Sequence, residues 1–126
     1  MIIDSNVIIY AIKPEFRLLR TYLVSNATTL YVSSITRLES LGFHRLTIEE
    51  ASQFDELFQI IKVLGIDETV ISEAIRLRQQ RKRSLGDSII AATALLHNLP
   101  VLTNNVADFA DVDGVRVISL ADVLNA

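Results

Sequence analysis

Short apolar runs alternate along this chain with longer segments in which apolar residues recur every three or four positions. Runs of the first kind predict buried strands, and segments of the second kind predict amphipathic helices. The predicted strands cover residues 1–4, 30–33, 63–66, 100–103 and 115–118. Because helical segments separate the first four strands, the alternation predicts a parallel sheet with helices on both faces.

Capping residues set the predicted helix boundaries. Pro14 suits the first turn of a helix that runs to about Ser25. Residues 33–34 can cap a helix through about His44, with an inward stripe at Ile35, Leu38, Leu41 and Gly42. The remaining helices are opened by the capping box at 47–50, by Asp67, by a second capping box at 84–87 and by Ser119.

Composition narrows the class of protein. The chain has 126 residues, 50% hydrophobic and 21% charged, which predicts one globular domain over residues 1–126. Twelve Lys and Arg against fifteen Asp and Glu leave a net charge of −3, so any nucleic-acid role needs a local basic patch. The sequence has no cysteine and no uncharged apolar run of about 18 residues. We therefore expect a cytoplasmic protein without disulfides, thiolate zinc sites or a membrane span.

Four acidic residues fall where predicted strands end or where the following helices begin. Asp4 ends the first strand, and Glu39 lies in the early turns of the helix after the second. Asp87 begins the helix that follows the second capping box, and Asp108 follows the strand at 100–103. Ligands of open parallel sheets bind beyond this edge, so we expect all four carboxylates to lie there.

Carboxylates that converge at this edge would repel one another. At about 5 Å and an effective dielectric of about 20, each pair costs roughly 3 kcal/mol. Mg²⁺ or Mn²⁺ relieves the repulsion because hard divalent cations take oxygen ligands, and Mg²⁺ keeps several of its waters. A retained water with a lowered pKa is a nucleophile suited to phosphodiester hydrolysis.

Each acid also has an ordinary structural interpretation. Asp4 would cap the segment after it, Glu39 would be a solvated helical glutamate, and Asp87 would be the acidic third residue of a capping box. Asp108 would be a turn residue, as we expect of Asp111 farther along the same loop. The contacts of each carboxylate separate these interpretations from the metal site.

Four segments together resemble the PIN-domain ribonucleases: MIIDSNVIIY, TRLESLG, LGDSIIAATAL and VLTNNVADF. They follow that family's order and usual spacing from residue 2 to about 110, and the VapC-type toxins of toxin–antitoxin pairs are the most similar members. The resemblance implies a three-layer α/β/α sandwich with a short central parallel sheet. It also implies RNA cleavage that depends on Mg²⁺ or Mn²⁺, a homodimer, and inhibition by a cognate antitoxin protein.

The resemblance assigns roles to the four acids. Asp4, Asp87 and Asp108 match the positions expected to hold the ion directly or through water. Glu39 matches the position expected to help orient the attacking water.

Supporting polar positions of the family are matched by Asn6, Thr103 and Asn105. In some relatives the acid of the late loop stands earlier, where this chain has Asn104 and Asn105. The fourth site residue is therefore either Asp108 or a loop asparagine.

A basic segment precedes Asp87. Five of the twelve cations fall within eight residues, at Arg76, Arg78, Arg81, Lys82 and Arg83. Such a cluster is typical of a solvated helix end whose cations complement the helix dipole, or of a surface that binds phosphate. Beside a metal site, we expect contacts with RNA phosphates or an acidic antitoxin segment at Arg78, Arg81, Lys82 and Arg83.

Two other functions compete with the nuclease. A phosphatase with Asp4 as a covalent nucleophile normally needs a second Asp two residues later, where this chain has Asn6. A PIN-like scaffold without nuclease activity would bind RNA or protein but no divalent ion. Titration with Mg²⁺ and Mn²⁺ discriminates between that module and the nuclease.

Overall fold

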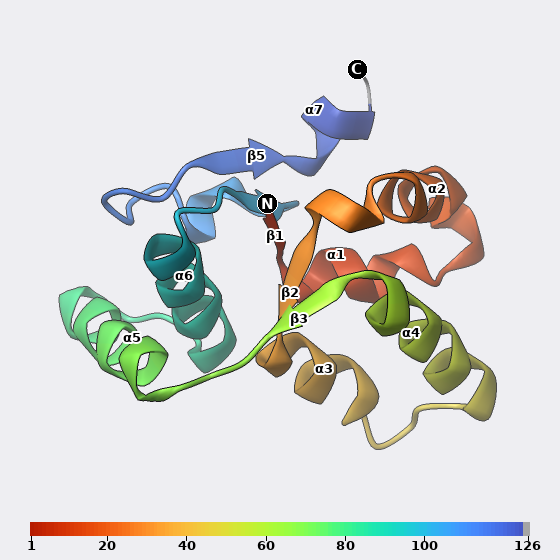
Figure 1. Ribbon diagram of the computed structural model, residues 1–126, viewed down its shortest axis with the longest axis horizontal. Helices are drawn as coiled ribbons and strands as arrows, with labels where there is room; N and C mark the ends of the chain where they lie inside the picture. The colour runs from red at the N-terminus through yellow and green to blue at the C-terminus, as the bar shows by residue number, and fades with distance from the viewer. Residues whose placement is uncertain (125–126) are drawn as a thin grey trace.

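Five short apolar runs form a single parallel sheet in the computed structural model, which describes residues 1–124 (Figure 1). The strands are β1 (Ile2–Ile3), β2 (Tyr31–Ser33), β3 (Lys62–Leu64), β4 (Val101–Thr103) and β5 (Val117–Ser119). Their spatial order is β3-β2-β1-β4-β5, and every neighbouring pair is parallel. The predicted parallel sheet is confirmed, with strands shorter than the apolar runs suggested.

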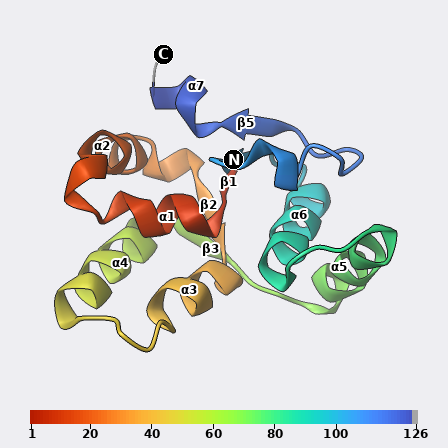
Figure 2. The same cartoon turned by 180° about the vertical axis from the view of Figure 1, so that it is seen from behind.

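Helices cover both faces of this sheet, as the predicted three-layer sandwich requires. Figures 1 and 2 show α5 and α6 on one side, and α1, α2 and α4 on the other. The α-helices are α1 (Ser5–Ala11), α2 (Arg17–Ser25), α3 (Ser34–Leu41), α4 (Ile48–Ile60), α5 (Glu68–Gln80), α6 (Leu85–His97) and α7 (Leu120–Leu124). Single 3₁₀ turns are η1 (Pro14–Phe16), η2 (Ala27–Thr29) and η3 (Val106–Asp108).

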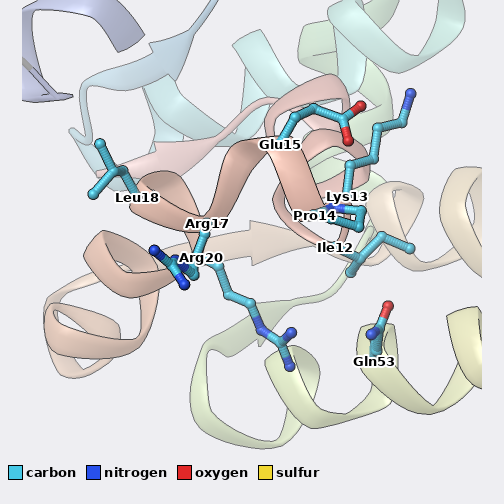
Figure 3. Close-up of a pocket in the computed structure, with 8 residues that line it drawn as sticks. All are labelled: Ile12, Lys13, Pro14, Glu15, Arg17, Leu18, Arg20 and Gln53. Carbon is cyan, nitrogen blue, oxygen red and sulfur yellow. The ribbon is translucent and has the colours of Figure 1, made fainter.

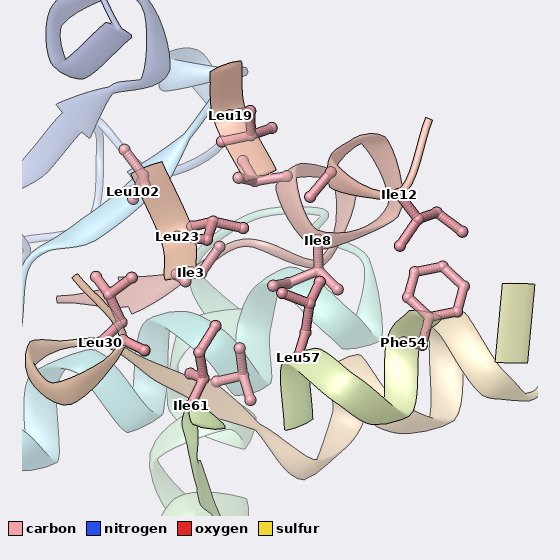
Figure 4. Packing of buried hydrophobic residues seen from close by; sticks show 14 of the residues in the cluster. Ile3, Ile8, Ile12, Leu19, Leu23, Leu30, Phe54, Leu57, Ile61 and Leu102 are labelled. Carbon is pink, nitrogen blue, oxygen red and sulfur yellow. The ribbon is translucent and has the colours of Figure 1, made fainter. Parts of the chain in front are cut away.

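The core has two halves because successive strand residues point to opposite faces. Ile3 and Leu102 pack with Leu23 and Leu57 on the side of α1, α2 and α4 (Figure 4). Ile2, one residue before Ile3, packs in the other cluster, against α5 and α6. Each fully buried Leu or Ile contributes about 1.5–3 kcal/mol of transfer free energy, so both faces hold the helices firmly.

Most predicted helix starts are confirmed by the capping bonds they make. Thr47 and Glu50 form a reciprocal capping box at α4. The side chains of Ser33, Asp67 and Ser84 accept backbone N–H bonds at the starts of α3, α5 and α6. None of the helices within residues 1–124 has the length and apolar run that a membrane crossing requires.

The prediction for α3 was wrong in its end and at Leu38, whereas Ile35 and Leu41 of the predicted stripe pack against the core. The helix stops at Leu41 instead of about His44, and Leu38, placed in the inward stripe, is 67% exposed. The buried positions of α3 are Thr36 and Ser40. The reason is that α3 packs against α1, α4 and α6, so its inner face meets polar groups as well as the core.

Candidate active site at the carboxyl edge of the sheet

The sheet order places a crevice at the carboxyl ends of β1 and β4. From β1 the chain continues to β2 on one side, whereas from β4 it continues to β5 on the other. Such a reversal between neighbouring parallel strands is where ligands of open sheets bind. Asp4 directly follows β1, and the polar residues 103–105 end β4 and continue beyond it.

Asp4 is buried and does not act as the helix cap that was its ordinary interpretation. Its side chain makes no capping bond at α1. Its Oδ2 instead accepts a 2.8 Å hydrogen bond from the Thr103 hydroxyl, which in turn accepts one of 2.9 Å from the Asn105 backbone N–H. Thr103 is fully buried, so the predicted polar position fixes Asp4 from the neighbouring strand.

Glu39 reaches the same edge from α3. The Ser5 hydroxyl donates to Glu39 Oε1 at 2.9 Å and shares a hydrogen bond of 2.9 Å with the Thr36 hydroxyl. Ser5 and Thr36 are buried, so Glu39 is held by a fixed network although its outer side is exposed. The sequence interpretation assigned no site role to Ser5 or Thr36, and a serine beside Asp4 was the only available signal.

Gly86 lets the Glu39 carboxylate lie against the first turn of α6. A Cβ at Gly86 would stand 2.6 Å from Glu39 Oε1, closer than real Cβ contacts occur. A glycine within a helix costs about 1 kcal/mol relative to alanine, which was a signal for a close approach at this position. The glycine therefore brings Glu39 beside Asp87, the next residue of α6.

Asp87 forms only half of the predicted capping box. Its backbone N–H donates to Ser84 Oγ at 3.1 Å. Burial, followed by the charges of Asp4 and Asp108, raises the pKa of Asp87 to about 6. Burial likewise raises the pKa of Asp4, and the Asp108 and Glu39 charges add to that rise while the Thr103 hydrogen bond opposes it. The structure thus brings the four predicted acids into one electrostatic environment.

These carboxylates fit a hard divalent cation by chemistry and charge. Within residues 1–124, however, no three Asp, Glu or His side chains stand close enough to bind one ion together directly. An ion at this edge would therefore take part of its ligand shell from water, which Mg²⁺ does readily. The raised pKa values of Asp4 and Asp87 indicate carboxylates whose charge the protein itself leaves poorly compensated.

Two hollows flank the acidic cluster. One, of about 250 Å³, is lined by Asp4, Asn6, Tyr10, Asn104 and Asn105. The other, of about 270 Å³, is lined by Arg81, Lys82, Arg83, Ser84, Asp87 and Asp108. The predicted supporting residues Asn6 and Asn105 therefore share a hollow with Asp4, whereas residues 81–83 of the basic segment share one with Asp87 and Asp108.

The basic segment divides into cations that pair with Asp111 and cations that do not. That Arg78, Arg81, Lys82 and Arg83 contact RNA phosphates or an antitoxin stays a prediction. The Arg83 side chain is 3% exposed, and its guanidinium donates to both carboxylate oxygens of Asp111. Arg81 donates to the same carboxylate. Arg78 and Lys82 are exposed and line an open groove of about 340 Å³. Burial and pairing restrict the Arg83 side chain. The other four cations of the segment are exposed: Arg76, Arg78, Arg81 and Lys82.

Asp111 is a residue whose importance the sequence did not reveal. It was expected to be a plain turn residue, but hydrogen bonds from Arg81 and Arg83 hold the pKa of its carboxyl well below the usual range. Its partners lie 28 and 30 residues earlier in the chain. No local pattern signals a contact over such a separation.

A further hollow has none of the four acids in its lining. It measures about 530 Å³ and is lined by Ile12, Lys13, Pro14, Glu15, Arg17, Leu18, Arg20 and Gln53 (Figure 3). In Figure 3 the side chains of Lys13 and Leu18 point away from each other. Arg20 forms an ion pair of 3.3 Å with Glu56, which lies outside the lining. The lining groups do not converge on one point, so size alone does not make this hollow a site.

Comparison with known proteins agrees with this geometry. The family model for the PIN domain matches residues 1–115. A toxin–antitoxin complex from Klebsiella pneumoniae has a similar structure, with a TM-score of 0.74, 27% identity and coverage of 93% of this chain and 94% of that chain. FitAcB from Neisseria gonorrhoeae gives a TM-score of 0.74, 26% identity and coverage of 93% and 95%.

A further solved structure supports the fold alone. VapBC2 from Rickettsia felis, bound to a DNA fragment from its promoter, gives a TM-score of 0.80 at 19% identity, with coverage of 94% of this chain and 96% of that chain. No curated protein sequence matches this chain.

Proposed function

Because the chain belongs to the PIN domain family, we propose that it is a metal-dependent endoribonuclease and the toxin of a toxin–antitoxin pair. The observation that carries the proposal is the group of four carboxylates at the strand ends, among which the pKa of Asp87 rises to about 6. The protein offsets little of the negative charge on these carboxylates, so binding of a divalent cation there is favourable.

Asp4, Asp87 and Asp108 would hold Mg²⁺ or Mn²⁺, directly or through water. When bound, the ion supplies a water of lowered pKa and neutralises charge on the phosphodiester. Asp4 is prepared for this role by the Thr103 hydroxyl, which fixes one carboxylate oxygen. We assign the fourth site position to Asp108 and not to a loop asparagine, and the action of its charge on both Asp4 and Asp87 supports this assignment.

Glu39 would orient the attacking water. Ser5 fixes Oε1 of Glu39, while Gly86 lets the carboxylate approach the first turn of α6. A carboxylate held in this way accepts a hydrogen bond from water in a defined direction, which lowers the entropic cost of attack. Its charge also adds to the rise in the pKa of Asp87.

RNA would approach along the exposed cations of the basic segment. Arg78 and Lys82 face solvent, so both are available to phosphate oxygens. Such contacts position a backbone without reading bases. Asn6 and Asn105 line the hollow that contains Asp4, where amide groups can hydrogen-bond to the sugar or base of the bound strand.

The partners follow from the same family. Solved relatives include toxin–antitoxin complexes, and we extend that association with an antitoxin to this chain. A homodimer is also part of the proposal, and the exposed Leu38 and Leu85 offer apolar surface for it. An RNA substrate and the absence of cysteine fit work in the cytoplasm.

The test combines metal binding with RNA cleavage. We expect wild-type protein to bind Mn²⁺ in a calorimetric titration, to cleave RNA, and to lose cleavage in excess chelator. Asp4→Asn should abolish cleavage, whereas Asp55→Asn, which removes an exposed carboxylate from α4, should not change it. Full cleavage by Asp4→Asn, or by wild type in chelator, would contradict the proposed mechanism.

The same titration separates the nuclease from a binding module on the PIN scaffold. Retention of RNA without any binding of Mn²⁺ or Mg²⁺ would favour the module. Binding of the ion below pH 6 should weaken, because a proton on Asp87 then competes with the cation.

A further inference from the structure

Asp108 lies in a segment that has little regular structure of its own. Residues 104–116, which connect β4 to β5, contain one element of regular structure, the single turn η3. Phe109 and Val112 of this segment are buried in the core beside α5 and α6. Apolar contact is non-directional, so these two anchors fix the depth of the segment but not its position along the sheet edge.

A cluster of directed hydrogen bonds supplies what the apolar anchors lack. Arg83 Nη1 and Nη2 donate to Oδ1 and Oδ2 of Asp111 at 3.2 and 3.0 Å, and Arg81 Nη2 donates to Oδ1 at 3.0 Å. Arg81 Nε donates to Oδ2. Paired guanidinium–carboxylate bonds are geometrically specific, so this arrangement, the Asp111 clamp, defines a direction as well as a distance.

The clamp is also tied to both segments that carry the outer acids. Arg83 Nε donates to the Leu77 carbonyl in α5 at 3.0 Å, which anchors the α5–α6 connection. Arg81 Nη2 approaches the Asp108 carbonyl at 3.4 Å. Residues 81–83 lead into the start of α6, where Asp87 lies. The clamp therefore joins the segment of Asp87 to the segment of Asp108.

Charge repulsion at this edge tends to separate the two segments that the clamp joins. Asp87 and Asp108 carry like charges that act on each other, and their repulsion favours movement of the less structured segment away from α6. The side chain of Arg83 is buried, so it has little freedom to follow such a movement. A buried fork gripping Asp111 holds residues 108–111 against that repulsion.

We propose that Asp111 is a positioning residue which, through Arg81 and Arg83, keeps Asp108 beside Asp87 so that both carboxylates can serve one divalent ion. The inference rests on the proposed function, because it assigns the pair of acids to an ion. Asp111 itself contacts neither RNA nor metal in this account, since its two oxygens are taken by the guanidinium groups.

The test compares Asp111→Asn with Asp113→Asn, which removes the same charge from an exposed position of the same loop. Calorimetric titration with Mn²⁺ should give a Kd about tenfold weaker for Asp111→Asn, in the range known for groups that orient metal ligands, and an unchanged Kd for Asp113→Asn. Asp111→Glu, which restores a carboxylate, should recover most of the affinity. Equal affinities for Asp111→Asn and wild type would overturn the inference while leaving the nuclease intact.

Two further measurements keep the outcome decisive. If Asp111→Asn does not fold, Arg81→Gln should still weaken Mn²⁺ binding severalfold, because this variant leaves the buried Arg83 pair in place. Binding of Mn²⁺ by Arg81→Gln as tightly as by wild type would overturn the proposal.

Amide hydrogen exchange over residues 104–112 in metal-free protein should be faster in Asp111→Asn or Arg81→Gln than in Asp113→Asn. Wild-type protein that neither binds Mn²⁺ nor cleaves RNA would refute the nuclease, and unchanged exchange would refute the clamp independently.

Discussion

Asp87 and Asp111 lie beside the same two arginines, but the pKa values of their carboxyl groups shift in opposite directions. Arg81 and Arg83 line the hollow that also contains Asp87, but their hydrogen bonds go to Asp111. The pKa of Asp111 falls well below its usual range because of these bonds. Burial and the Asp4 and Asp108 charges raise the pKa of Asp87 to about 6.

The comparison shows which carboxylates the fold pairs with cations. Two guanidinium groups compensate a carboxylate that holds a loop, and the carboxylates at the strand ends are left to repel one another. A carboxylate whose pKa is raised in the folded protein costs free energy of folding once it is charged. The difference supports the proposal that this site takes a cation from solution.

The largest effect should come from removing charge on the uncompensated side of this comparison. Asp87→Asn should lower the rate of RNA cleavage by more than about a hundredfold, since a direct ligand matters more than the groups that orient ligands. Single-turnover cleavage of a labelled RNA at saturating Mn²⁺ measures the change. A rate within tenfold of wild type would show that Asp87 is not part of the metal site, and Asp55→Asn is the control for loss of a carboxylate.

A smaller loss should follow from filling the space at Gly86. Gly86→Ala places a methyl group 2.6 Å from Glu39 Oε1, and the carboxylate must swing away and give up its bond from Ser5. We expect cleavage to fall about tenfold because the attacking water loses its orienting group. Mn²⁺ affinity should change little. Gly65→Ala is the matched control, since no atom lies within 4 Å of the added Cβ there.

Asp87→Asn should raise the stability of the protein, although it lowers the rate of RNA cleavage. The pKa of Asp87 is about 6 in the folded protein, against an ordinary value of 3.8 for an exposed aspartate, so folding binds protons between these values and stability falls as pH rises through that window. In chelator at pH 8, Asp87→Asn should therefore be more stable than wild type by about 1 kcal/mol, after discounting for solvent screening of a half-exposed group.

Urea unfolding at several pH values measures this difference. The gap between Asp87→Asn and wild type should close near pH 4, where the folded protein already holds the proton. A variant less stable than wild type at pH 8 would contradict the assignment of Asp87 as an uncompensated carboxylate.

The smallest effect should come from the exposed cations. Lys82→Gln should weaken RNA binding by about two- to threefold and reduce the dependence of log K on log salt by about one unit, because one phosphate contact is lost. Lys62→Gln removes the same charge at the opposite, amino end of the strands and should leave both quantities unchanged. Fluorescence anisotropy at several salt concentrations distinguishes the two variants.

Much of the fold could be predicted from the sequence because its signals are local. The apolar runs marked the strands, and caps such as Thr47 and Asp67 marked helix starts through bonds to residues only three positions away. The place of Asp4 also followed from local order, since the residue after a parallel strand lies at the carboxyl edge. The prediction that Leu38 is buried was wrong because an apolar stripe does not show which neighbouring element a helix packs against.

The site contained features that local patterns do not encode. The bond from Thr103 to Asp4 spans 99 residues, and the pairing of Arg83 with Asp111 spans 28. Such contacts depend on which strands become neighbours, and the sequence alone left that order open. The basic segment was therefore interpreted as a single surface, whereas the fold buries Arg83 and exposes Lys82.

The most direct test of the central claim is the anomalous scattering of a crystal soaked in Mn²⁺. We expect one strong peak at the carboxyl ends of β1 and β4, about 2–2.5 Å from oxygens of Asp4 or Asp87, with waters completing the shell. Ordered side chains of Asp4, Glu39, Asp87 and Asp108 without a peak between them would contradict it.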